Sequence, residues 1–393
     1  MSRKLPLLVL LLALIARAGI FRLPHREGDE RIYAALLSQV RAGHGYTLRG
    51  HPILEQDWMV RDQYDTPLFY HPPGGLAWFA AFTALFGERG WDLAQLAAFA
   101  VFFLATYALA RDTLPAFPPE AALTVGLLAG ATPIVAHVSM HRWLDGPQVA
   151  AIALAALISV RAARSGSAGS AIGAGIAIGA AVLIKMSAAL ALPGMIALAW
   201  AASPGRTTRQ RVRTVAIAGG VAALCLLPWL IAEARAFGTI FPSWAGKPSA
   251  RLVAENPFIR QVTVVRSPWV YLRLLPTTVW TLGPSLAILA LSRRRGGVPL
   301  ACALWIAIVT AAGITLGAIG YSKLLRYLVP IGPAAVVLAG FAAGEVVRRR
   351  GALGVVLRVV LAAAVLAEVA QGIQTLIVYP DRAWIRPLAG EPR

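Results

Sequence analysis

Charged residues are scarce in this sequence. Asp, Glu, Lys and Arg make up 14% of its 393 residues, whereas a soluble globular protein carries roughly 25%. Cysteine is scarcer still: Cys225 and Cys302 are the only two, and each lies inside an apolar run. Such cysteines favour buried, inert thiols over a disulfide framework or a zinc cluster. The composition therefore excludes an ordinary soluble domain and a cysteine-based scaffold.

Long apolar runs take the place of these charges. Hydrophobic residues make up 58% of the chain, and the mean hydropathy is +0.66. Apolar windows of about 16–25 residues recur along it, each able to cross a hydrocarbon core about 30 Å thick. We therefore predict an all-α polytopic membrane protein with about 11 transmembrane helices. The predicted spans are 5–21, 91–110, 120–140, 146–162, 169–185, 187–202, 213–232, 275–292, 298–320, 324–346 and 351–378.

Arginine runs fall in alternate gaps between these spans. Clear examples are 206–213, 293–295 and 348–350. This alternation matches the positive-inside rule and predicts a cytoplasmic N-terminus. The net charge of +19 then reflects topology and contact with anionic lipid headgroups, with no nucleic-acid partner expected. The basic, apolar N-terminus resembles a signal peptide, but it lacks a small-residue cleavage site, so we predict an uncleaved first span.

The same alternation places two long loops on the outer side, 22–90 and 233–274. Within the first, 74–86 is apolar but too short to span, and a span there would invert every later gap. We predict an interfacial helix at that point. The chain is expected to form one transmembrane domain, 1–378, followed by a short outer tail, 379–393.

Ionisable side chains gather at the predicted outer ends of the spans. Such groups are costly at membrane depth and usually functional. A carboxylate in this position could act as general base on an acceptor hydroxyl, although acids in a first helical turn also serve as caps. The basic groups could bind phosphate or simply snorkel to the interface. The residues concerned are Asp29, Glu30, His141, Asp145, Lys185, Lys323 and Arg326.

An aromatic, proline-rich stretch follows in the first loop. Tyr64, Tyr70 and, from the preceding helix, Tyr33 could line a substrate or anchor the loop at the interface. His71 and His141 lie near the acids without metal-ligand spacing, so a divalent ion stays unassigned and no cofactor is certain. The glycine-rich stretch 166–179 follows no strand, and its small-residue period favours helix packing over a nucleotide-binding loop.

Taken in order, these segments resemble the C-type (GT-C) membrane glycosyltransferases. The nearest branch contains the lipid A aminoarabinose transferases and the protein O-mannosyltransferases. The resemblance covers roughly residues 1–345. It is carried by Asp29-Glu30 with Tyr33, Leu85-Phe86-Gly87, Leu144-Asp145, Ile184-Lys185, Leu227-Pro228-Trp229, and Lys323 to Pro330.

This resemblance implies a helical bundle with interfacial helices in the first outer loop. It implies transfer of a sugar, with inversion, from a polyprenyl-phosphate donor to a lipid, glycan or protein acceptor. Asp29, Glu30 and Asp145 are the implied catalytic acids. Lys185, Lys323, Arg326 and His71 would bind the donor phosphate, and Tyr33, Tyr64, Tyr70 and His141 would line the substrate. His71 stands where the aminoarabinose transferases carry a lysine, and the additional C-terminal domain of longer relatives is not expected.

Two other functions remain open at this stage. A transporter or flippase of a lipid-linked sugar would also need cations for phosphate, and it would show discontinuous helices and often an internal repeat. A non-catalytic assembly protein would not need acids and lysines gathered on the outer side. The alanine-, arginine- and glycine-rich composition suggests a bacterial inner or plasma membrane, with the active site facing the periplasm or exterior.

Overall fold

The computed structural model describes residues 4–23, 28–56, 59, 61–114, 117–240, 250–292 and 296–377. Within these residues every regular element is a helix, as predicted. The predicted tail 379–393 and the arginine run 293–295 lie outside the described residues. The helices of the bundle are α1 (Lys4–Arg17), α5 (Gly90–Thr113), α6 (Pro119–Ala131), α8 (Asp145–Ser165), α9 (Ala168–Ile184), α10 (Leu192–Ala201), α11 (Thr208–Phe237), α15 (Leu282–Leu291), α16 (Gly297–Ala318), α17 (Gly332–Arg348) and α18 (Ala352–Ile377).

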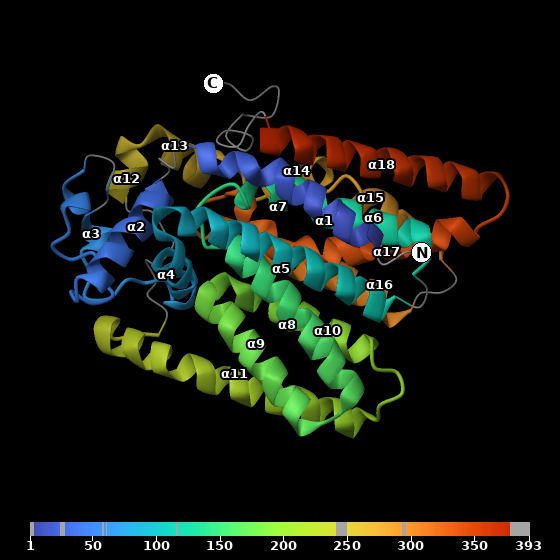
Figure 1. The fold of residues 1–393 in the computed structure, drawn as a ribbon, viewed down its shortest axis with the longest axis horizontal. Coiled ribbons are helices and arrows are strands. Elements are labelled where there is room, and N and C mark those ends of the chain that lie inside the picture. The colour runs from blue at the N-terminus through green and yellow to red at the C-terminus, as the bar shows by residue number, and fades with distance from the viewer. Residues whose placement is uncertain are drawn as a thin grey trace.

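These helices form an elongated bundle with a cap of short helices at one end (Figure 1). The N-terminus lies at the opposite end. The cap comes mainly from the two predicted outer loops. Its elements are α2 (Gly28–Arg41), η2 (Pro52–Glu55), α3 (Arg61–Tyr64), α4 (Gly74–Phe86), α12 (Ala250–Glu255) and α13 (Pro257–Arg260).

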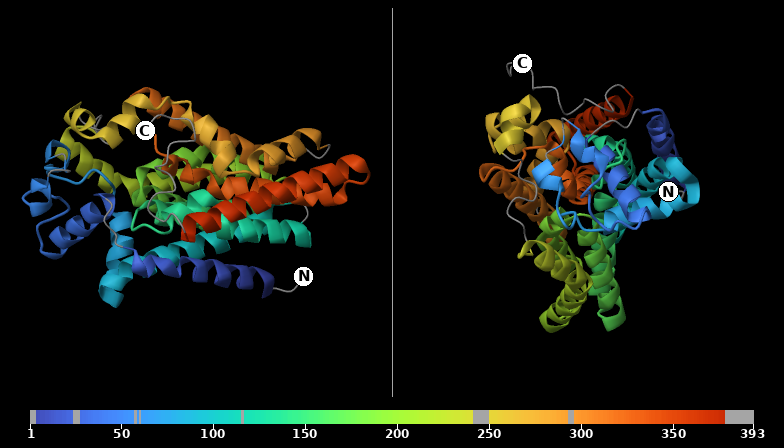
Figure 2. Two further views of the ribbon diagram at one scale, coloured as in Figure 1. Left: turned by 90° about the horizontal axis from the view of Figure 1, so that it is seen from above. Right: turned by 90° about the vertical axis from the view of Figure 1, so that its left-hand side faces the viewer.

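Helix α4 corresponds to the predicted interfacial helix. Gly87, with a φ of 61°, ends it, and the short η3 (Gly87–Arg89) leads into α5. A side chain at this φ would be strained, so glycine allows the sharp change of direction. Figure 2 shows α4 lying across the end of the bundle, transverse to α1 and α5. The first loop thus carries a short helix where the interfacial helix is predicted, and its place at the membrane surface stays a prediction.

The number of spans differs from the prediction. Eight helical stretches of the described chain are long and apolar enough to cross a membrane, or nine if one bent pair is counted as a span. The expected count of about 11 is therefore not confirmed. The predicted spans 169–185 and 187–202 fall on shorter apolar helices. The predicted span 275–292 divides into α14 (Val270–Thr278) and α15, which meet at 87°.

Prolines account for several of these breaks. Pro133 begins α7 (Pro133–Val138) after a break at Thr132, which splits the predicted span 120–140. Pro193 lies in the first turn of α10 and follows the 3₁₀ segment η4 (Met186–Ala191). Proline lacks the backbone N–H of an interior helical residue, so helices begin or bend where it occurs.

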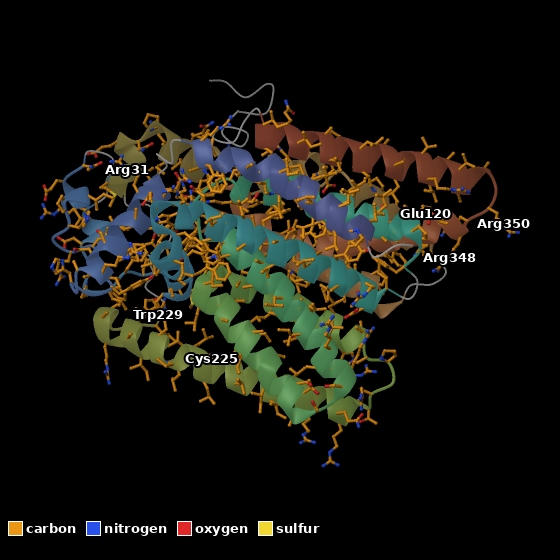
Figure 3. The ribbon with its side chains drawn as sticks, viewed as in Figure 1. Arg31, Glu120, Cys225, Trp229, Arg348 and Arg350 are labelled. Carbon is orange, nitrogen blue, oxygen red and sulfur yellow. The ribbon has the colours of Figure 1, made fainter. Side chains whose placement is uncertain are left out.

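Basic side chains mark the end of the bundle away from the cap. Figure 3 shows Arg348 and Arg350 at that end, opposite Arg31 and Trp229. Arg161, at the inner end of the predicted span 146–162, contacts Asp112 at 2.9 Å. Arg348 and Arg350 thus lie at the end of the long axis away from the cap, and which end faces the cytoplasm stays a prediction.

Two glycines of the 166–179 stretch support close packing of α9 on α11. A Cβ on Gly175 would lie 2.5 Å from the carbonyl oxygen of Ala218, and one on Gly179 would lie 2.7 Å from the Cβ of Cys225. Glycine therefore lets the two backbones approach. Gly169 and Gly173 have no atom within 4 Å of such a Cβ, so they do not contribute to this contact.

A separate apolar cluster fixes the cap to the bundle. Leu36 of α2 and Phe79 of α4 are fully buried, and Trp91 of α5 and Leu144 are nearly so. Burial of such side chains contributes roughly 1.5–3 kcal/mol each. This cluster holds the acidic end of α2 over the start of α8.

Candidate functional site

Asp29 and Arg326 form an ion pair beneath the cap. The Oδ2 atom of Asp29 lies 2.7 Å from Nη1 of Arg326, and the two side chains are 32% and 17% exposed. Asp29 lies in the first turn of α2, where the helix dipole favours a carboxylate. Arg326 belongs to η6 (Leu325–Ile331), which precedes α17. The pair therefore joins the first loop to a segment close to the other end of the sequence.

Asp145 and Lys185 form a second, more deeply buried pair. Nζ of Lys185 donates to Oδ1 of Asp145 at 2.7 Å, with side chains only 9% and 2% exposed. Asp145 is the first residue of α8, and Lys185 is the extended residue that ends α9. Because α8 and α9 are consecutive helices packed against each other, the start of one meets the end of the other.

The two pairs belong to one electrostatic cluster. Burial raises the pKa of the Asp29 carboxyl, but the charge of Arg326 and its hydrogen bond, helped by Lys185, leave that pKa below its ordinary value. Asp29 is therefore ionised at neutral pH, as a general base must be. The cluster holds two carboxylates and two cations.

An aromatic group lies beside the cluster. The ring centre of Tyr33 is 6.4 Å from that of Phe69 and 6.3 Å from that of His71. The ring centre of Tyr70 is 4.4 Å from that of His71 and 5.9 Å from that of Tyr64, and both pairs of rings are tilted. The three tyrosines predicted to line the substrate are thus brought together with His71.

These aromatic side chains are neutral at physiological pH. Burial, together with the charge of Asp29, raises the pKa of Tyr33 and of Tyr64, so both phenols keep their protons. Burial lowers the pKa of His71 to about 3. His71 can therefore offer a phosphate a hydrogen bond but not a permanent positive charge.

Glu30 turns away from this cluster and holds a neighbouring loop. Its Oε1 accepts the backbone N–H of Arg142 at 2.9 Å and lies 3.5 Å from Nδ1 of His141. Glu30 and His141 are both nearly fully buried. Their predicted roles, catalysis for Glu30 and substrate lining for His141, stay predictions.

Arg142, Asp92 and Glu88 form a contact set that the sequence analysis missed. The guanidinium of Arg142 donates to both oxygens of Asp92, at 2.9 and 3.1 Å, and to Glu88 at 2.6 Å. This fixes the loop before α8 to the start of α5. The signal in the sequence was an arginine on the predicted outer side, against the positive-inside trend, with acids near the outer start of the predicted span 91–110.

Lys323 makes different contacts from the other predicted phosphate ligands. Its ammonium donates to the backbone carbonyl of Thr263, and its backbone N–H donates to Val262 at 2.8 Å. Both partners belong to the π-helical segment η5 (Gln261–Val265) of the second outer loop. Lys323 thus anchors that loop, and its predicted contact with phosphate stays a prediction.

Metal binding has no counterpart in the described residues. Over the described ranges, no group of three or more His, Cys, Asp or Glu side chains is arranged to hold a metal ion.

Comparisons with known proteins agree with this architecture. A sequence model of the dolichyl-phosphate-mannose-protein mannosyltransferase family matches residues 70–231. That segment contains Asp145, Lys185 and the interfacial helix α4. No curated protein matches the chain in a sequence comparison.

Solved structures match over most of the chain. ArnT from Cupriavidus metallidurans matches with a TM-score of 0.60 and 20% identity, over 88% of this chain and 60% of its own. The structure of ArnT from the same organism bound to undecaprenyl phosphate matches with a TM-score of 0.56 and 19% identity, over 88% of this chain and 59% of its own. The Archaeoglobus fulgidus oligosaccharyltransferase matches with a TM-score of 0.56 and 12% identity, over 94% of this chain and 56% of its own.

These matches show the fold. The chain has the C-type glycosyltransferase architecture, so the resemblance inferred from its ordered motifs is confirmed. The chain spans less than two thirds of the length of each solved relative named above.

Proposed function

We propose that this protein is an inverting glycosyltransferase that moves a sugar from a polyprenyl-phosphate donor to an acceptor at the outer face of its membrane. The observation that carries the proposal is the Asp29–Arg326 pair beside the Lys185–Asp145 pair. One arrangement supplies both a base for an acceptor and cations for a phosphate. The likeness to ArnT, whose structure is bound to undecaprenyl phosphate, supports the choice of donor.

The cations suit the leaving group. When the bond between the anomeric carbon and the phosphate oxygen breaks, the oxygen keeps the electron pair and the phosphate gains negative charge. Fixed cations next to that oxygen stabilise the transition state. Arg326 is suited to this because its guanidinium can bind two phosphate oxygens together, and Lys185 supplies a point charge.

Asp29 suits the other half of the reaction. The acceptor oxygen attacks the anomeric carbon from the face opposite the phosphate, and its proton passes to the carboxylate of Asp29. One displacement inverts the anomeric centre. If the acceptor is itself a phosphate, it needs no proton removed, and Asp29 would then position it by accepting hydrogen bonds from hydroxyl groups elsewhere on the acceptor.

Donor binding is expected to change the partner of Arg326. A phosphate competes with the Asp29 carboxylate for the same guanidinium. The Asp29–Arg326 pair is the more exposed of the two pairs, so it exchanges more readily than Asp145–Lys185. The exchange would loosen Asp29 from Arg326 when the donor is in place and leave it available to the acceptor.

The aromatic group suits the sugar. Sugar rings present C–H faces that pack on aromatic rings, and Tyr33, Tyr64 and Tyr70 add neutral hydroxyl groups. Burial raises the pKa of Tyr33 and of Tyr64, so both side chains are uncharged and favour contact with an uncharged part of the substrate.

The first experiment is donor turnover. Purified wild type, Asp29→Ala and the control Glu55→Gln would each receive an undecaprenyl-phosphate-linked sugar pool, with membrane extract as acceptor. Glu55 is an exposed acid of the same loop. Loss of donor with wild type and Glu55→Gln, but not with Asp29→Ala, is the expected result. A folded wild type that binds the donor but leaves it intact with every sugar pool and extract would refute the transferase.

One observation favours a flippase as second candidate. Discontinuous helices, which the sequence analysis did not detect, are present in the α14–α15 bend of 87° and the α6–α7 break at Thr132. Transporters often bind substrates at such breaks. Movement of intact donor across vesicles containing the purified protein would support this function.

A further inference from the structure

The guanidinium of Arg326 has more than one neighbour. Besides Asp29, the ring of Trp143 lies beneath it, with the ring centre 4.6 Å from Cζ. Nε of Arg326 is buried and has no hydrogen-bond partner in the described part of the chain. A single ion pair leaves an arginine free to turn about its long side chain. The face of Trp143 adds a further restraint, because the electron-rich ring attracts the cation, and it lies nearer than the ring of Tyr327, whose centre is 5.9 Å from Cζ.

Trp143 is itself firmly held. Its ring stacks on His141 with centres 4.1 Å apart and planes 10° from parallel, and only 8% of the residue is exposed. Its backbone carbonyl accepts a hydrogen bond from Nε2 of Gln95 at 2.7 Å. Ring and backbone are therefore fixed independently, which a lipid-facing tryptophan would not require.

Glu30 secures the next layer. Its contacts with His141 and with the backbone of Arg142 hold the two residues just before Trp143. Arg142 is in turn bound to Asp92. The neighbouring acids of α2 thus reach the same arginine by two routes, Asp29 by direct contact and Glu30 through His141 and Trp143.

We propose that Trp143 is a positioning residue that holds the guanidinium of Arg326 in the orientation that receives the donor phosphate, with Glu30 and His141 fixing the tryptophan. This inference rests on the proposed function. It assigns Asp29 to the reacting groups and Glu30 to the support of Arg326. Its consequence is that removing the ring of Trp143 impairs the enzyme only through Arg326.

The test compares Trp143→Leu with Trp143→Phe. Leucine removes the aromatic face, whereas phenylalanine keeps a face and loses only the indole N–H. We expect Leu to lower kcat/KM for the donor roughly 3- to 30-fold and Phe to restore most of the loss. Trp280→Leu is a matched control, because Trp280 is 42% exposed and bonds to Gln371, away from the cluster.

A double-mutant cycle separates positioning from general structure. In an Arg326→Gln background, which removes the cation, the change Trp143→Leu should have little further effect on the residual kcat/KM or on binding of undecaprenyl phosphate. Independent effects that multiply in the double variant would overturn the proposal. So would a folded Trp143→Leu protein with wild-type kcat/KM.

The same cycle measured on unfolding temperature needs no substrate. Suppose that Trp143 and Arg326 are coupled in unfolding, but that the wild type neither binds nor consumes any donor. The contact between the two side chains would then stand, whereas the proposed function and the role assigned toward phosphate would both be rejected. Absence of coupling in both measurements would reject the positioning role, even in an active transferase.

Discussion

The carboxylate of Asp29 lies 2.7 Å from the guanidinium of Arg326, so the first outer loop is bound by charge to the segment that leads into α17. Each residue restrains the reactivity of the other. Asp29 is kept ionised, and Arg326 is kept from binding another anion as strongly as a free guanidinium would. The relationship makes the two halves of the proposed reaction interdependent.

Replacing Asp29 should separate binding from chemistry. Asp29→Asn removes the base, and kcat should fall about 10²- to 10⁴-fold. The same change removes the anion that competes for Arg326, so undecaprenyl phosphate should bind more tightly than to wild type. Donor turnover and calorimetric binding measure the two effects. Weaker binding by a folded Asp29→Asn protein would contradict the exchange of partners at Arg326.

The pH dependence of turnover should report the same pair. The ionised form of Asp29 is the active one. Because its pKa is lowered, Asp29 stays ionised at pH values at which an ordinary aspartate would be protonated. The acid limb of kcat/KM should therefore lie at lower pH than the limb that an ordinary aspartate would give. In Arg326→Gln the attraction is lost and burial remains, so the limb of the residual activity should move to higher pH. A limb at the same pH in both proteins would assign it to another group.

The buried Asp145–Lys185 pair should matter most for stability. Lys185→Met leaves a buried carboxylate without its partner and should destabilise the protein by about 3–5 kcal/mol. Adding Asp145→Asn should recover part of this loss, because the uncompensated charge is gone. Unfolding temperatures in detergent provide the measurement. Lys323→Met is the control, since its ammonium contacts a carbonyl, and it should cost less.

The first turn of α4 should be sensitive to a single methyl group. A Cβ on Gly74 would lie 2.7 Å from the carbonyl oxygen of Leu183, two residues before Lys185. Gly74→Ala should therefore push α4 away from the end of α9, displace Lys185 and lower donor turnover. Gly173→Ala, with nothing within 4 Å, should leave turnover unchanged. Equal turnover in the two variants would show that the contact at Gly74 yields without disturbing the site.

Much of the site could be predicted from charge alone. Asp29, Asp145, Lys185 and Arg326 were singled out because they interrupt apolar sequence at one predicted face, and the structure brings these four together. Their pairing could not be predicted, because it depends on how α2 and η6 meet over α8. The division between Asp29 and Glu30 was also hidden, since adjacent helical residues point about 100° apart and only the packing shows which way each faces.

The helical class and most of the spans followed from composition and hydropathy, but the breaks within helices did not. Hydropathy averages over a window, so it merged α14 with α15, which meet at 87°, and it did not reveal the break between α6 and α7 at Thr132. Arg17 shows the same limit. It sits inside the predicted first span, yet it is fully buried, with its guanidinium 3.5 Å from the ring centre of Phe99 and a bond to Ser139. A window hydropathy cannot see such internal partners.

The wide spacing of the cluster along the chain has a consequence for biosynthesis. Asp29 leaves the ribosome early, whereas Arg326 follows only after most helices have been made. Until then Asp29 must be solvated by water or by lipid headgroups, since a bare carboxylate in hydrocarbon is costly. The apolar contacts of α2 with Phe79, Trp91 and Leu144 can form early, but the charge that pairs with Asp29 arrives only with η6. A nascent chain stalled before residue 326 should therefore hold the start of α2 less tightly, and limited proteolysis should cleave it faster there than in the finished protein.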